Sequence, residues 1–403
     1  MRFYGYDSSW KVSKLGELFE IYSGNTPSRS DRNNYDNGTI PWIKTTDLNN
    51  SLIYVNEEKI TDHGAKKLKT LPKNTILIAM YGGFNQIGRT GLLTYPATIN
   101  QALASLLPVK EINSYFLLNY LNLRKDSWRN VAASSRKDPN ITKNDVEKFK
   151  ISFPSLEEQS AIGSLFRILD DLLASYKENL ANYQSLKATM LSKMFPKAGL
   201  TVPEIHLYGF EGEWEVQILK EIASFSKGNG YTKNDLVNSG KEIILYGRLY
   251  TNYQTVISKV NTFVTTVKAN TVLSKGGEVI VPASGESAKD ISRASVVEKS
   301  GVILGGDLNI IYPDENKVDS IFLALTISNG SQQKELIKRA QGKSVVHLRN
   351  NDLEKVVLHY PSMEEQQAIG SYFSNLDQLI TSYQEKITQL ETLKKKLLQD
   401  MFI

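Results

Sequence analysis

The sequence contains one long segment twice. Residues 153–195 and 360–402 align without a gap at a constant offset of 207, and 21 of their 43 positions are identical. Each copy opens with Pro-Ser, continues into Glu-Glu-Gln and ends in Met-Phe. A duplication restricts the architecture more than any short motif, because both copies are expected to fold as the same kind of unit.

The start of each unit is repeated as well. Trp10-Lys11-Val12 matches Trp214-Glu215-Val216, and Gly24-Asn25 matches Gly228-Asn229, at an offset of 204. Between these ends, residues 26–151 and 230–359 show only scattered correspondence. We therefore predict two domains with shared ends and divergent middles. Their predicted bounds are 1–152 and 201–358, and the shared segments occupy 153–200 and 359–403.

The shared segments are predicted to be helices of about 40 residues. Apolar and aromatic side chains recur in them every seven residues, which is typical of coiled-coil packing. The positions predicted to pack are Ile162, Leu169, Tyr176, Tyr183 and Met190 in the first copy and Ile369, Leu376, Tyr383, Leu390 and Leu397 in the second. A helix of this length spans about 60 Å, too much for one domain to cover, so the stripe must pack on another helix.

The first turn of each predicted helix has a capping pattern. Ser155 and Ser362 are the predicted N-caps, and Glu158 and Glu365 follow three residues later, which completes a capping box. Acidic residues in a first turn also interact favourably with the helix dipole. We therefore assign the repeated carboxylates to helix initiation and not to catalysis.

The divergent middles are predicted to be mixed α/β domains with a curved sheet. Short β-branched segments bounded by turn residues indicate strands at residues 75–80, 242–246 and 278–281. Residues 113–128 and 317–339 are expected to be helical in their second halves.

The charge is distributed unevenly. Residues 1–152 contain 21 Lys and Arg against 14 Asp and Glu, whereas residues 197–359 contain 19 against 18. A basic domain suits phosphate contacts, so we expect the first domain to contribute more to salt-dependent affinity. The chain has no cysteine, no predicted membrane span and no secretory signal, which favours a cytoplasmic protein.

Catalytic and cofactor motifs are not recognisable. Gly342-Lys343-Ser344 lacks the earlier glycine of a phosphate-binding loop, and Asp138-Pro139-Asn140 lacks the second proline and the aromatic residue of an adenine-methyltransferase motif. The four histidines have no metal-ligand spacing. We expect no catalytic, cofactor-binding or metal-binding residue in this chain.

The order of the segments resembles the specificity subunits of type I restriction-modification systems. The resemblance covers the whole chain and is carried by Pro154-Ser155-Leu156-Glu157-Glu158-Gln159 and its second copy, Pro361-Ser362-Met363-Glu364-Glu365-Gln366. Ile40-Pro41-Trp42-Ile43 and Asn100-Gln101-Ala102 are similar to elements of the first recognition domain in that family, whereas the second domain has Leu245-Tyr246-Gly247-Arg248 and Asp307-Leu308-Asn309 in their places.

The resemblance implies two tandem target-recognition domains separated by two long antiparallel coiled-coil helices, with internal pseudo-twofold symmetry. It implies that each domain reads one half of a bipartite, asymmetric site in double-stranded DNA. Partners would be two modification subunits, which methylate adenine N6 with S-adenosylmethionine, and restriction subunits that use ATP and Mg²⁺. The chain itself would be non-catalytic.

Candidate DNA contacts are loops that combine glycine with cationic, amide or hydroxyl side chains. Lys and Arg contact phosphates, and Arg, Asn and Gln also read base edges. The predicted residues are Lys44, Thr45, Thr46, Asn85, Gln86, Arg89, Arg136 and Lys137 in the first domain and Lys227, Asn229, Tyr231, Arg248, Lys289, Arg293 and Lys343 in the second.

Two other hypotheses remain open from the sequence. A stand-alone DNA-binding regulator with a coiled-coil spacer would bind its target tightly without a methyltransferase partner. An enzyme such as a nuclease with unrecognised motifs would cleave DNA as the isolated chain.

Overall fold

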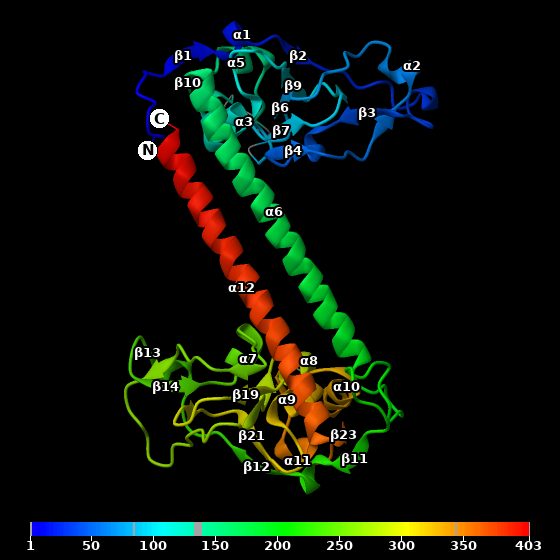
Figure 1. The fold of residues 1–403 in the computed structure, drawn as a ribbon, viewed down its shortest axis with the longest axis vertical. Helices are drawn as coiled ribbons and strands as arrows, with labels where there is room; N and C mark the ends of the chain where they lie inside the picture. The colour runs from blue at the N-terminus through cyan, green and yellow to red at the C-terminus, as the bar shows by residue number, and fades with distance from the viewer. Residues whose placement is uncertain (1, 84, 133–138, 343–344, 403) are drawn as a thin grey trace. The chain divides into compact units, whose positions relative to one another are not determined.

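The computed structural model describes residues 2–83, 85–132, 139–342 and 345–402 (Figure 1). The chain divides into two compact units. Unit 1 comprises residues 1–177 and 385–403, and unit 2 comprises residues 178–384. Each unit therefore contains one α/β domain together with part of both long helices.

The domain of unit 1 is built on a five-stranded sheet with the order β2-β9-β6-β7-β4. All neighbours are antiparallel except β4 and β7. A smaller sheet has the order β5-β3-β8, and β1 pairs with β10 in a separate ribbon. The strands are β1 (Lys11–Lys14), β2 (Ile21–Ser23), β3 (Ile40–Ile43), β4 (Ser51–Ile53), β5 (Lys59–Ile60), β6 (Ile76–Ala79), β7 (Thr90–Leu93), β8 (Thr98–Ile99), β9 (Leu103–Leu106) and β10 (Lys150–Phe153). The helices are α1 (Leu15–Leu18), α2 (Asp62–Ala65), α3 (Ser114–Leu123), α4 (Ser127–Val131) and α5 (Lys143–Lys148).

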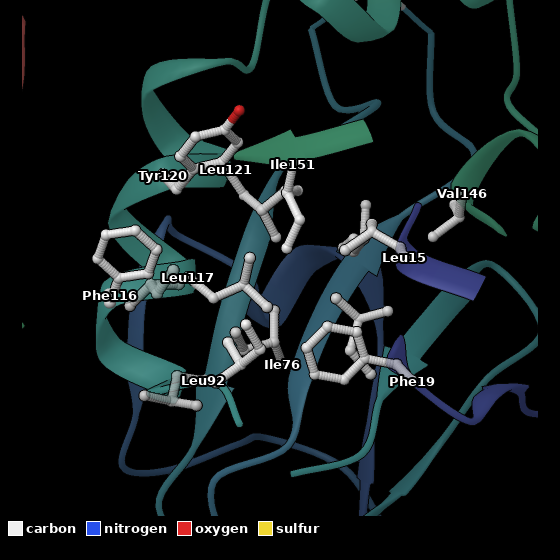
Figure 2. Packing of buried hydrophobic residues seen from close by; sticks show 14 of the residues in the cluster. Leu15, Phe19, Ile76, Leu92, Phe116, Leu117, Tyr120, Leu121, Val146 and Ile151 are labelled. Carbon is white, nitrogen blue, oxygen red and sulfur yellow. The ribbon is translucent and has the colours of Figure 1, made fainter. Parts of the chain in front are cut away.

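The main core of unit 1 lies between this sheet and α3. Figure 2 shows Phe116, Leu117 and Leu121 of α3 near Ile76 and Leu92 of the sheet, and all five side chains are buried. Removing these side chains from water provides the principal stabilisation of the domain.

The domain of unit 2 has the same sheet order although its sequence differs. Its five-stranded sheet is β12-β21-β17-β19-β15, again antiparallel except for the last pair, β19 and β15. A second sheet has the order β13-β16-β14-β20, and β11 pairs with β23.

The strands are β11 (Glu215–Ile218), β12 (Ala223–Lys227), β13 (Leu236–Val237), β14 (Lys241–Ile244), β15 (Val256–Ile257), β16 (Phe263–Val264), β17 (Val279–Pro282), β18 (Ser284–Gly285), β19 (Ser295–Val297), β20 (Ile303–Leu304), β21 (Leu308–Pro313), β22 (Val346–His347) and β23 (Val357–Tyr360). The helices are α7 (Arg248–Thr251), α8 (Ala288–Ile291), α9 (Ser320–Ser328), α10 (Gly330–Arg339) and α11 (Asn350–Leu353).

The predicted strands coincide with β6, β14 and β17, and the mixed α/β class is confirmed. The prediction for residues 113–128 was wrong in placing the helix in the second half of the segment. The helix α3 begins at once, because the Asn113 side chain caps it by accepting from the backbone nitrogens of Tyr115 and Phe116. Asp319 caps α9 in the same way through the nitrogen of Phe322.

The two predicted long helices are present as α6 (Leu156–Lys193) and α12 (Met363–Met401). Among the ten predicted packing positions, the four nearest the helix starts are buried and the other six are half-buried. Ile162 and Ile369 are the most completely buried, at 1% exposure each. The sevenfold stripe is therefore the packed face of each helix.

Within each unit, α6 and α12 run antiparallel. In unit 1, Asp170 pairs with Lys394, and Lys177 pairs with Glu391 at 2.7 Å. In unit 2, Lys187 pairs with Asp377. As the residue number rises along α6, the residue number of its ion-pair partner in α12 falls. The Lys187–Asp377 pair is the repeat equivalent of Lys394–Asp170, since both residues shift by 207.

The end of each long helix is held by an aromatic cluster. In unit 1, the ring of Phe402 lies 5.2 Å from Phe116 and 5.7 Å from Phe166. In unit 2, the ring of Phe195 lies 5.8 Å from Phe322 and 6.2 Å from Phe373. Trp10 and Trp214 complete the two clusters. The repeated tryptophans and Met-Phe ends therefore have a packing function.

A buried glutamine joins the start of each long helix to its domain. Gln159 accepts a hydrogen bond from the nitrogen of Asn113 and donates to the carbonyls of Glu111 and Pro154. Gln366 accepts from the nitrogen of Asp319 and donates to the carbonyls of Lys317 and Pro361. Both side chains are essentially inaccessible, so each amide satisfies backbone groups that water does not reach.

The predicted capping boxes are half correct. Ser155 and Ser362 do accept from the backbone nitrogens of Glu158 and Glu365, at 3.3 Å. The buried glutamate carboxylates instead bind side chains that lie near the start of each α/β domain. Glu158 accepts from Arg2 Nε at 2.8 Å, and Glu365 lies 2.7 Å from His206 Nδ1. A buried carboxylate needs an ionic or hydrogen-bonding partner, which explains why these side chains turn away from the cap.

We expect Gln366→Ala to lower the free energy of unfolding by about 3 kcal/mol, because it removes one acceptor and two donors from buried partners. The neighbouring Gln367 is exposed, and Gln367→Ala is the matched control with an expected effect below about 0.5 kcal/mol. Urea unfolding followed by circular dichroism measures both. Equal effects of the two substitutions would contradict the bridging role.

Candidate DNA interface

One candidate site lies in the domain of unit 2. A cavity of about 680 Å³ opens between the segment at residues 230–236 and the segment that begins at Leu245. Its lining includes Tyr231, Tyr246 and Arg248, with Asn252 and Asn261 supplying amides. Amide, aromatic and guanidinium groups are the types that read or stack on bases.

Arg248 organises one side of this cavity. Its guanidinium donates to Asn261 Oδ1 at 2.9 Å, to Gln254 Oε1 at 2.8 Å and to the carbonyl of Lys259 at 2.9 Å. Partial burial lowers the pKa of the guanidinium below its usual value. These three bonds span the loop that follows α7. The structure therefore gives Arg248 a loop-holding role, which differs from the direct base or phosphate contact predicted for it.

Tyr231 also has a structural role. Its side chain is 4% exposed, and its hydroxyl lies 2.8 Å from Thr271 Oγ1 and accepts from the nitrogen of Lys268 at 2.7 Å. The Lys268 ammonium lies 4.5 Å from the centre of the ring. This burial does not support the predicted DNA contact of the Tyr231 side chain, because the bonded hydroxyl faces its own domain.

The repeated Gly-Asn pair has a packing explanation. A Cβ atom on Gly24 would lie 1.8 Å from the carbonyl oxygen of Ile99, and one on Gly228 would lie 1.9 Å from that of Gly305. The following asparagine nitrogen donates to the carbonyl of Ile99 in unit 1 and to that of Leu304 in unit 2. Glycine is required where two backbones approach this closely. Asn229 is exposed beside this contact, and its side chain donates to the carbonyl of Asn270.

The two domains place predicted loops at equivalent points. β3 pairs in parallel with β8, and β14 pairs in parallel with β20. Lys44, Thr45 and Thr46 follow β3, and Leu245–Arg248 follow β14. The predicted match of Leu245–Arg248 with Ile40–Ile43 is wrong by four residues, because Ile40–Ile43 form β3 and the equivalent strand β14 ends at Ile244. The two loops are equivalent although they share no residues.

In the first domain, Lys44 is held by an acidic partner. Its ammonium lies 2.8 Å from Glu58, which also binds Arg29. The bond from Arg29 is the main cause that holds the pKa of Glu58 below its usual value. The Arg29 guanidinium also lies 4.6 Å from the Tyr35 ring and 5.0 Å from the Trp42 ring. The prediction missed this cluster because its members are separated in sequence.

The remaining predicted residues are distributed over several loops. Asn85 is exposed, whereas Gln86 and Arg89 are half-buried, and Arg89 donates to the carbonyl of Asn85 at 3.4 Å. Lys227 is exposed at the end of β12. Lys289 and Arg293 line a second cavity beside α8. Arg136, Lys137 and Lys343 lie outside the described residues.

The described part of the chain contains no group of three or more His, Asp or Glu residues arranged to hold a metal ion. Within the same residues, no helix is both long and apolar enough to cross a membrane.

Two α/β domains of one topology, each attached to a repeated helix, define the class of protein to which this chain belongs. The type I restriction modification DNA specificity domain matches residues 7–182 and 211–392. The chain therefore belongs to the family of type I restriction-modification specificity subunits.

Known relatives agree with this assignment. The MjaVIII specificity subunit of Methanocaldococcus jannaschii is 22% identical over 96% of this chain and 91% of its own length. The EcoR124I/EcoR124II specificity subunit of Escherichia coli is 29% identical over 42% of this chain and 43% of its own length. The S subunit of a type I system from M. genitalium shares the fold, with a TM-score of 0.65 at 17% identity, over 99% of this chain and 97% of that one.

We expect Arg248→Ala to loosen the segment at residues 252–262, which contains the short strand β15, without unfolding the domain. Three acceptors would lose their shared donor, so backbone amides in this segment should exchange with deuterium faster. Arg248→Lys keeps the charge but not the planar fork, and it should restore protection only in part. Hydrogen-exchange mass spectrometry measures both variants. Unchanged exchange in Arg248→Ala would contradict the loop-holding role.

Proposed function

We propose that this chain reads a bipartite, asymmetric DNA target, with one domain for each half-site. The main support is that two domains of one topology carry different residues in equivalent loops, at Lys44–Thr46 and at Leu245–Arg248. Shared topology allows both domains to approach a duplex in the same manner, and different loop chemistry allows each to select different bases. The two helices set the distance between the half-sites.

In this proposal the chain is non-catalytic and holds no cofactor. Catalysis resides in two modification subunits, which methylate adenine N6 with S-adenosylmethionine, and in restriction subunits that use ATP and Mg²⁺. Family membership supports this division of roles between subunits and favours it over the alternative of a stand-alone DNA-binding regulator.

Exposed leucines on the long helices mark the proposed docking surface for the modification subunits. Leu186 and Leu379 are each 41% exposed in unit 2 and lie one and two residues from the Lys187–Asp377 pair. Their repeat equivalents in unit 1 are Leu393, 45% exposed, and Leu172, 36% exposed. Leucine at all four solvent-facing positions fits a partner that binds both units in the same way.

Replacing residues 201–358 with the recognition domain of another specificity subunit should change one half of the methylated target and leave the other half intact. Independent half-site reading is the reason for this expectation. Methylome sequencing of cells that express the chimera with the modification subunit measures the motif. Simultaneous change of both halves, in a chimera that still supports methylation, would contradict one reader per half-site.

The double variant Leu186→Glu and Leu379→Glu should bind one modification subunit instead of two, because charge would be forced into one of two apolar contacts. Native mass spectrometry of the co-expressed complex measures the stoichiometry. The matched control is Thr189→Glu with Gln378→Glu, which adds the same charge at exposed positions of the same helices. A complex that retains both partners in the leucine variant would argue against this docking surface.

A further inference from the structure

A second cavity in unit 2, of about 310 Å³, lies where the C-terminal part of α6 meets the domain. α6 contributes Lys187 and Leu191, and the segment before β15 contributes Tyr253 and Thr255. The rest of the lining comes from α8, α9 and α10 and from the residues that directly follow α8 and α9; the labels of these helices gather at this end of unit 2 in Figure 1.

The lining of this cavity is cationic. It contains Lys187, Lys289 and Arg293 and no Asp or Glu. Lys187 is neutralised by Asp377, which lies beside the cavity and is also bonded by Thr255 Oγ1 at 3.3 Å. Among the described residues, no carboxylate lies within 4 Å of the charged nitrogens of Lys289 or Arg293. Two positive charges therefore face one cavity without an internal counter-ion.

Arg293 is positioned to bind an oxyanion. Its guanidinium lies 5.5 Å from the centre of the Tyr253 ring, which restricts its motion. The guanidinium is half-buried, and Lys289 is exposed at the rim. A guanidinium fork and an ammonium together match the geometry of a phosphate group.

The first turn of α10 faces the same cavity. Asn329 and Gln333 both line it, and Asn329 is the N-cap of this ten-residue helix. The Asn329 side chain makes no capping bond, because its amide donates back to the carbonyl of Leu325 at 2.8 Å. The positive end of the helix dipole adds to the charge of Lys289 and Arg293.

Unit 1 uses the equivalent position differently. There Asp170 accepts a hydrogen bond from the Tyr115 hydroxyl of α3 at 2.7 Å, whereas in unit 2 Asp377 accepts one from Thr255, which precedes β15.

We propose that this cavity is a phosphate-binding site, in which Lys289 and Arg293, beside the N-terminal end of α10, hold one phosphate group of the DNA backbone. The proposal rests on DNA reading by this chain and adds a contact point at the junction of domain and helix. A phosphate bound here would fix the register of the domain on the duplex, and it would do so for any base sequence.

The test uses the full-length chain and a 30-base-pair duplex of random sequence, with affinity measured by fluorescence anisotropy over a series of salt concentrations. The slope of log affinity against log salt is negative, and each lost phosphate contact decreases its steepness by about 0.9. We expect this decrease in Lys289→Gln and in Arg293→Gln, and an unchanged slope in Arg293→Lys. The matched control, Lys355→Gln, removes an exposed charge of the same domain outside the cavity and should leave the slope unchanged. Thermal unfolding checks that all variants are folded.

A second arm identifies the source of the phosphate. Inorganic phosphate and chloride are compared at equal ionic strength for their effect on the melting temperature of the wild type and of Lys289→Gln.

The outcomes separate the site from the proposed function. If the wild type binds DNA and the cavity variants keep the full slope, the site is overturned and the proposed function stays intact. A wild type that binds no duplex would contradict the proposed function. In that case, phosphate stabilisation lost in Lys289→Gln would assign the cavity to a free phosphate compound, and no such stabilisation would overturn the site.

Discussion

The burial of one phenylalanine at the end of each long helix is the contact on which the architecture depends. Phe195 follows the end of α6, whose first turn contains Gln159 of unit 1, yet it packs on Phe322 and Trp214 in unit 2. Phe402 follows the end of α12, whose first turn contains Gln366 of unit 2, yet it packs on Phe116 and Trp10 in unit 1. Each helix is thus fixed at its start by a buried amide and at its end by an aromatic cluster, and the two anchors lie in different units. Neither unit is complete without residues from the other half of the sequence.

Repetition of the anchors leaves the loops free to differ. The glutamine bridge, the aromatic cluster and the Gly-Asn contact recur in both units because each satisfies buried backbone groups or fills a core. The loops after β3 and β14 do not share these contacts, and Lys44–Thr46 and Leu245–Arg248 differ completely. A specificity subunit can therefore change what it reads without losing its fold.

The predicted DNA contacts stay predictions, and the structure shows which of these side chains are also bonded within their own domain. Arg248 and Tyr231 were chosen because their residue types bind DNA, but the structure uses both to hold loops. Lys289 and Arg293 were chosen on the same grounds, and they face a cavity without an acidic partner. Residue type alone does not distinguish these cases, because a guanidinium forms the same bonds with protein acceptors as with phosphate or bases.

The sequence by itself determined the duplication, the two long helices, the packing stripe and the family. These features repeat at fixed spacing, and periodicity is a local property that survives without coordinates. The tertiary structure decided which half of each helix belongs to which unit, where the buried carboxylates find partners, and which cations remain unpaired. Those properties depend on contacts between residues more than 100 positions apart, such as Arg2 with Glu158 and His206 with Glu365, and chain folding alone brings them together.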